Sequence, residues 1–157
     1  SLMRIALPGL SLQDSKRALE VELTRACEFV IAHVQQTSLE PMLAFLSNHS
    51  PPPPGTEDQT AAAEAARKPS RAQCEQALQA SVRCAEEHLP RLNASLDLYL
   101  RNPVTLRILL RPVRANVEDT LNQFSACTQW ALTDEDRDAL DVPGQLARIR
   151  AVLDALG

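Results

Sequence analysis

The sequence is poor in glycine and in aromatic residues, and both shortages bear on the class of protein. Four glycines occur among 157 residues, which is too few for a loop-rich enzyme whose glycine turns cradle a phosphate group. Aromatic residues make up 3% of the chain, so its core has to be built mostly from Leu, Val and Ala. Such cores are typical of helical bundles, whereas compact β-domains usually carry more β-branched and aromatic residues. The composition therefore predicts an all-α protein.

Long apolar runs and an excess of positive charge are also missing. No apolar run reaches the roughly 18 residues of a transmembrane helix, and the first residues lack the continuous apolar stretch of a signal peptide. The net charge of −4 argues against a general nucleic-acid binder. We therefore expect a cytosolic protein without nucleic-acid partners. Its four cysteines are Cys27, Cys74, Cys84 and Cys127. We expect buried, reduced thiols rather than disulfides, since Cys27 and Cys127 lie on or beside the apolar faces of their helices.

The longest helical pattern in the sequence extends from Leu106 to Ala131. Apolar or small residues recur there at steps of three or four: Leu106, Leu110, Val113, Val117, Leu121, Phe124, Thr128 and Ala131. This spacing predicts an amphipathic helix of about seven turns, roughly 40 Å long. A helix of this kind cannot bury its apolar face alone, so we expect other helices to cover it.

Two helices are predicted before the middle of the chain. The first begins at Ser11 or Asp14, which can cap it, and continues to about Gln36. Its expected apolar face comprises Leu12, Leu19, Leu23, Ala26, Val30 and Val34. Thr37 or Ser38 is expected to cap a second, short helix with Pro41 in its first turn. The apolar face of this short helix comprises Met42, Leu43, Phe45 and Leu46.

The segment 48–69 interrupts the helical pattern and is predicted to be a flexible loop. It holds five of the eleven prolines, including Pro51 to Pro54, and no bulky apolar residue. A proline run can bind an SH3-like module. Because no flanking specificity residue accompanies this run, a solvated loop is the preferred interpretation.

Another long helix is predicted to follow a cap at Ser70 and to end at Asn102-Pro103. Its apolar face comprises Cys74, Leu78, Val82, Ala85, Leu89, Leu92, Leu96 and Tyr99. The tight link to the Leu106–Ala131 helix predicts that the two are antiparallel neighbours, and internal prolines predict a kink near Pro90 and a bend at Pro112.

The C-terminal part is predicted to hold a short helix and a final amphipathic helix. Thr133 can cap the short helix, whose first turn is acidic, and Asp141 to Gly144 are expected to break it. The last helix has the apolar face Leu146, Ile149, Val152, Leu153 and Leu156. The prediction for residues 1–157 is a single α-helical domain, an antiparallel bundle of about four long helices plus short ones.

No catalytic, cofactor or metal site emerges from the sequence. The alternating acids after Thr133 resemble the start of a calcium loop, but Ala139 and Gln145 stand where that loop needs glycine and glutamate. Cys84 and His88 have zinc-ligand spacing, but a site needs further ligands, for which Cys74 and His33 are the candidates after folding. None of the three histidines has a nucleophile elbow or glycine turn beside it. We therefore expect no enzyme activity, cofactor or metal.

A row of arginines on the central helix is the candidate partner-binding surface. Arg107, Arg111 and Arg114 recur at steps of four and three, and Arg101 lies just before them. Such a face can meet an acidic partner helix or anionic lipid headgroups. The alternative is a solvated face that pairs with local acids such as Glu118.

Parts of the sequence resemble a known family. The residues that carry the resemblance lie mainly in the two longest predicted helices: Leu89–Leu92, Leu96–Leu100, Ile108–Val117 and Phe124, with Pro112, Val113, Arg114 and Asn116 as the most specific. Further similar positions are Leu7, Pro8, Lys16, Leu23, Cys27, Phe29 and Thr133–Asp136. Together they resemble the C-terminal region of subunit 3 of the conserved oligomeric Golgi complex, over most of the chain outside 48–69.

This resemblance implies a fold, a location and a set of partners. It implies the C-terminal end of a large cytosolic subunit built as a helical rod, which acts without catalysis in vesicle tethering during retrograde intra-Golgi transport. The implied partners are other subunits of the complex, SNAREs, Rab GTPases and the vesicle coat. The implied location is the cytoplasmic face of the Golgi, with peripheral membrane association only. The alternative function is a helical adaptor of another complex that binds a proline-recognising or lipid partner.

Overall fold

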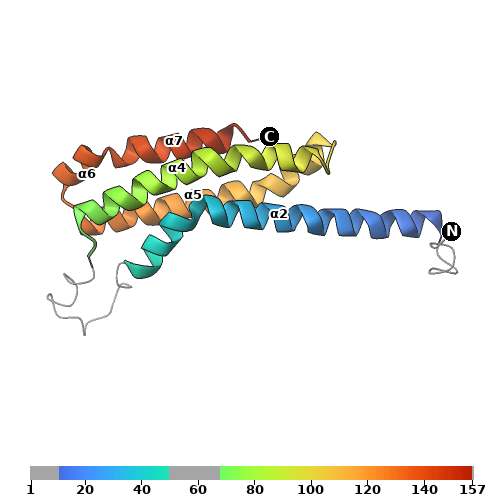
Figure 1. The fold of residues 1–157 in the computed structure, drawn as a ribbon, viewed down its shortest axis with the longest axis horizontal. Helices are drawn as coiled ribbons and strands as arrows, with labels where there is room; N and C mark the ends of the chain where they lie inside the picture. The colour runs from blue at the N-terminus through green and yellow to red at the C-terminus, as the bar shows by residue number, and fades with distance from the viewer. Residues whose placement is uncertain (1–10, 50–67, 157) are drawn as a thin grey trace.

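The computed structural model describes residues 11–49 and 68–156, which form helices and no strand. The helices are α2 (Leu12–Asn48), α4 (Arg71–Asp97), α5 (Pro103–Ala131), α6 (Asp134–Leu140) and α7 (Val142–Asp154). The four longer ones pack around one apolar core and the short α6 joins α5 to α7 (Figure 1). The predicted all-α bundle is thus confirmed. Most of the predicted loop at 48–69 lies outside the described residues.

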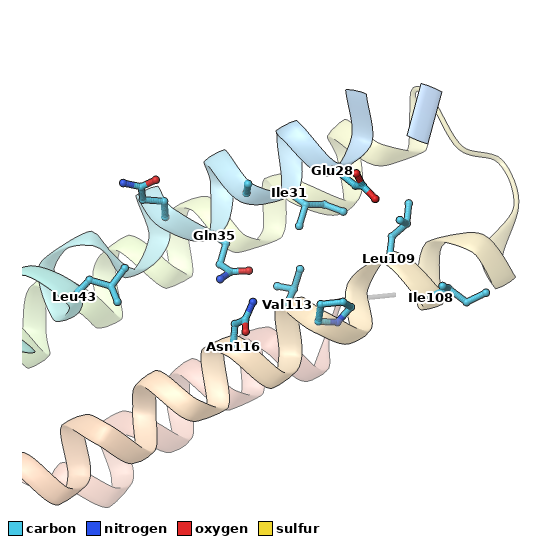
Figure 2. A pocket seen from close by; sticks show the side chains of 11 residues that line it. Glu28, Ile31, Gln35, Leu43, Ile108, Leu109, Val113 and Asn116 are labelled. Atoms are coloured by element: carbon cyan, nitrogen blue, oxygen red, sulfur yellow. The ribbon is translucent and has the colours of Figure 1, made fainter. Parts of the chain in front are cut away.

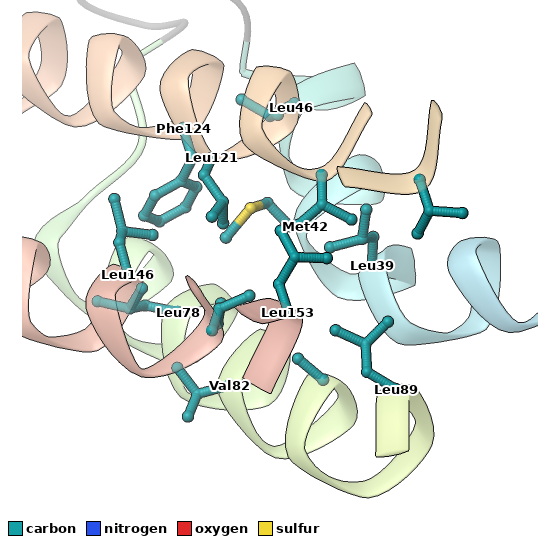
Figure 3. Packing of buried hydrophobic residues seen from close by; sticks show 14 of the residues in the cluster. Leu39, Met42, Leu46, Leu78, Val82, Leu89, Leu121, Phe124, Leu146 and Leu153 are labelled. Atoms are coloured by element: carbon teal, nitrogen blue, oxygen red, sulfur yellow. The ribbon is translucent and has the colours of Figure 1, made fainter. Parts of the chain in front are cut away.

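The four long helices alternate in direction along the chain, but consecutive helices are not all neighbours. α2 contacts both α4 and α5, and α7 also contacts both. Figure 3 shows α5 and α4 on opposite sides of the core, with α2 and α7 between them. The prediction that α4 and α5 are neighbours is therefore wrong, although they are antiparallel. The five-residue link between them can span up to about 17 Å, enough to cross the bundle.

α2 is one continuous helix, and the predicted break near Gln36 is wrong. Pro41 lies inside it and has no N–H to donate, so one backbone hydrogen bond is missing. The Thr37 and Ser38 hydroxyls do not cap a new helix. They donate to the carbonyls one turn earlier, with Ser38 Oγ 2.6 Å from the Val34 oxygen. Such bonds favour bending, and Figure 1 shows the C-terminal part of α2 turning away from the line of its N-terminal part.

The buried face of α2 also differs from the predicted one. Leu12 and Leu19 are 90% and 70% exposed, and Ala26 is exposed as well. Cys27 is the first buried residue, and the buried residues of α2 are Cys27, Ile31, Ser38, Leu39, Met42, Phe45 and Leu46. Of the predicted face, Val30 and Val34 are partly buried against this core. The N-terminal part of α2 extends beyond the other helices (Figure 1), so none of the described helices covers Leu12 or Leu19.

The apolar faces of the other helices lie in the core as predicted. Ser70 caps α4 in a capping box with Gln73, and Asn102 caps α5, whose first residue is Pro103. The predicted stripes are buried or partly buried apart from Tyr99, which is 49% exposed. Tyr99 is exposed because α4 ends at Asp97, earlier than predicted, and the chain turns there.

A single residue separates α6 from α7. Thr133 caps α6 as predicted, but the break after it is confined to Asp141, which has a left-handed backbone (φ 50°). Asp141 ends α6 and its carboxylate accepts a hydrogen bond from the Gly144 N–H at 3.2 Å, so it also caps α7. Gly144 lies in the first turn of α7, where a Cβ atom would collide with that carboxylate.

We expect Asp141→Ala to lower the free energy of unfolding by about 2 kcal/mol. Alanine removes the cap and is strained at positive φ, and each effect costs about 1 kcal/mol. Asn at position 141 can still cap α7 and tolerates positive φ, and Gly tolerates positive φ. Asp141→Asn and Asp141→Gly are therefore each expected to lower the free energy of unfolding by less than about 0.5 kcal/mol. Urea denaturation followed by circular dichroism measures the series. If Asp141→Gly and Asp141→Ala lower the free energy of unfolding equally, the left-handed backbone of residue 141 does not contribute to the cost of the alanine variant.

Candidate partner-binding surfaces

The first turns of α5 carry the predicted arginine face at one end of the bundle. Arg101, Arg107 and Arg111 are exposed there. Arg107 and Arg111 line a shallow pocket of about 260 Å³ together with Arg114 and with Leu156, which follows the end of α7. The structure thus brings the three predicted residues to one side of α5, where they line this pocket together with Leu156.

Arg114 differs from Arg107 and Arg111 because its side chain contacts the C-terminal residues of the same chain. Its guanidinium donates to the backbone carbonyl of Leu156 at 2.5 Å and lies 3.4 Å from the Asp154 carboxylate. The negative end of the α7 helix dipole stabilises a cation at this position. Glu118 does not pair with the arginine face, since its carboxylate lies 3.0 Å from Arg150 of α7. In the part of the chain that the structure describes, Arg101, Arg107 and Arg111 therefore stay exposed.

A second surface is a groove between α2 and α5, with a volume of about 690 Å³. Ile31 from α2 and Leu109 and Val113 from α5 point into it (Figure 2). Its other lining residues are Glu28, Ala32, Gln35, Gln36, Leu43, Ile108, Pro112 and Asn116. Between Glu28 and Leu43 it follows α2 for about 22 Å at 1.5 Å per residue. A groove that is apolar in its floor and polar at its edges fits the apolar face of a helix.

Sequence reasoning missed this groove because it assigned α2 a different buried face. The residues of α2 that line the groove lie on its side toward α5, next to the buried Cys27 and Ile31. No periodic signal within one helix marks the groove, because it forms only where α2 and α5 come together.

The cysteines are free thiols, and three of them are buried. Burial raises the pKa of the Cys74 and Cys127 thiols to about 11, so both stay protonated at physiological pH. Burial also raises the pKa of Cys27. Among the residues that the structure places, no group of three or more His, Cys, Asp or Glu side chains could hold a metal ion. The predicted burial of Cys27 and Cys127 is confirmed.

The family of the chain follows from a comparison with protein-family models. The model described as the COG3 C-terminal cap domain matches residues 22–156. The chain belongs to the COG3 family. No curated protein and no solved structure gives a significant match. The matched range begins ten residues inside α2, so it contains the whole bundle and excludes the exposed Leu12 and Leu19.

Membership of the COG3 family gives the chain a molecular context. COG3 is a subunit of the conserved oligomeric Golgi complex, so its partners include other subunits of that complex and its location is associated with the Golgi. In the part of the chain that the structure describes, no helix is both long and apolar enough to span a membrane.

Proposed function

We propose that this chain forms the C-terminal helical end of a non-enzymatic subunit that tethers vesicles in retrograde intra-Golgi transport. In this proposal the α2–α5 groove receives an amphipathic helix of another subunit of the complex. SNAREs, Rab GTPases and the vesicle coat are further partners of the assembled complex on the cytoplasmic face of the Golgi.

The groove between α2 and α5, which none of the described residues covers, is the observation that carries the proposal. Core residues such as Val113, which is 1% exposed, form its floor, yet Leu43 and Ile108 at its edges are 41% and 62% exposed. Apolar surface of this kind, bordered by glutamines and an asparagine, is typical of protein contacts. Since the family places the chain among other subunits, another subunit is the natural occupant.

Cells whose only copy of the subunit carries Ala32→Glu are expected to lose retrograde tethering. Ala32 is exposed in the groove, so the substitution leaves the core intact but places a second carboxylate one turn from Glu28. Golgi-resident enzymes should then move from the Golgi membrane fraction into free vesicles, which cell fractionation measures.

Ala44→Glu is the matched control for this experiment. Ala44 is exposed on the same helix, outside the groove, and lies one turn after Glu40, so the change in charge and the like-charge spacing are the same. Cells with Ala44→Glu should keep their enzymes in Golgi membranes. Normal retention in Ala32→Glu cells would contradict the proposal.

A further inference from the structure

The turn between α4 and α5 and the first turns of α5 form a surface of unusual composition, which we call the tip. Residues 98–117 contain four arginines and no acidic residue, although the whole chain has a net charge of −4. Of the acids around this segment, Asp97 comes just before the turn, Glu118 pairs with Arg150, Asp154 pairs with Arg114, and Glu28 lies across the α2–α5 groove from Ile108. Positive charge is therefore concentrated at one end of an otherwise acidic protein.

The same surface exposes large apolar side chains. Leu98 is 81% exposed, Val104 61% and Ile108 62%, and Tyr99 is 49% exposed. On α5, Val104 and Ile108 are one turn apart, and Arg107 and Arg111 each follow one of them by three residues. Helical spacing therefore places the two apolar residues and the two arginines in adjacent rows on one face.

The shape of the tip favours a lipid surface over a protein helix. The exposed Leu98 and Tyr99 lie in the turn that joins α4 to α5, at the end of the bundle beyond which α2 continues (Figure 1). Side chains on an exposed turn can enter the boundary between headgroups and acyl chains, whereas an acidic helix needs a groove or a flat face. Arginines beside them can bind lipid phosphates, and tyrosine prefers this boundary.

We propose that the tip docks on an anionic membrane surface, with Leu98, Tyr99, Val104 and Ile108 entering the headgroup region and Arg101, Arg107 and Arg111 binding lipid phosphates. Ile108 also lies at the edge of the α2–α5 groove, but the tip needs no partner subunit to act. A purified chain with vesicles therefore tests the tip separately from the groove.

The test is co-sedimentation of the purified 157-residue chain with vesicles. Vesicles of phosphatidylcholine with about 30% phosphatidylserine should bind the chain at low salt and release it at high salt. Vesicles of pure phosphatidylcholine should bind it much less. Arg107→Glu/Arg111→Glu should weaken binding more than about 25-fold, since each arginine near an anionic surface contributes about fivefold. Leu98→Ala/Ile108→Ala should weaken it at least tenfold, because both truncations remove apolar surface that enters the headgroup region.

Two double variants elsewhere serve as matched controls. Arg71→Glu/Arg83→Glu makes the same change in net charge at exposed positions of α4 away from the tip, and Leu12→Ala/Leu19→Ala truncates similarly exposed leucines on α2. Both should bind like the unaltered chain. The proposal is overturned if the anionic vesicles do not bind the chain, if the controls weaken binding as much as the tip variants, or if an acidic helical peptide binds the tip while the vesicles do not.

Discussion

Phe124→Ala is expected to lower the free energy of unfolding by about 3–5 kcal/mol. Phe124 is fully buried, and its ring centre lies 5.3 Å from that of Phe45, so the ring joins α5 to the C-terminal part of α2. Figure 3 shows it facing the core beside Leu121. Its removal loses the transfer free energy of the ring and leaves a cavity that the neighbouring helices fill only in part. Because a domain of this size is stable by only about 5–15 kcal/mol, the loss is a large fraction of the total.

Phe29→Ala is the matched control for the core substitution. Phe29 lies on α2 and is 75% exposed, so the same truncation should change the stability by less than about 0.5 kcal/mol. Urea denaturation followed by far-ultraviolet circular dichroism measures both variants. A comparable loss for the two would show that Phe124 does not lie in the shared core.

Ala32→Glu is expected to lower the amount of other complex subunits that co-purify with the tagged chain at least tenfold. A carboxylate in a groove that a helix covers loses its water and finds Glu28 one turn away instead of a cation. Leaving such a charge buried and unpaired costs about 3 kcal/mol, or roughly a hundredfold in Kd. Since Ala32 is exposed in the chain alone, the stability should stay nearly unchanged.

Ala44→Glu should leave the co-purified amount within about twofold of the unaltered chain, because its carboxylate faces away from the groove and stays hydrated. Quantitative mass spectrometry of the purified material compares the two variants. If both variants retain the subunits equally, the groove is not where the complex binds this chain.

The sequence was sufficient to predict the helices whose apolar faces are covered by other helices along their length. The stripe from Leu110 to Thr128 is buried because its spacing matches a helix covered on that face by the bundle. In α2 the pattern was misleading. Leu12 and Leu19 suggested a core face, but they lie on a part of the helix that extends beyond the bundle. Periodicity locates a helix face, but it cannot say whether another helix covers that face.

The candidate surfaces were predicted only in part for a related reason. The steps between Arg107, Arg111 and Arg114 correctly placed them on one side of α5. The bond from Arg114 to the Leu156 carbonyl depends on where α7 ends in space, which spacing along one helix does not give. The groove requires the relative positions of α2 and α5, and the continuation of α2 through Pro41 was itself unexpected.

Site-specific photo-crosslinking from the groove tests the central claim most directly. A photo-reactive amino acid replaces Gln36, which is exposed and lines the groove, and in a second variant it replaces Ala44 outside it. In the assembled complex, the account predicts that position 36 crosslinks to an amphipathic helix of another subunit and that position 44 does not. Equal crosslinking from both positions, or none from position 36 in a complex that contains the chain, would contradict the assignment of the groove as the docking site.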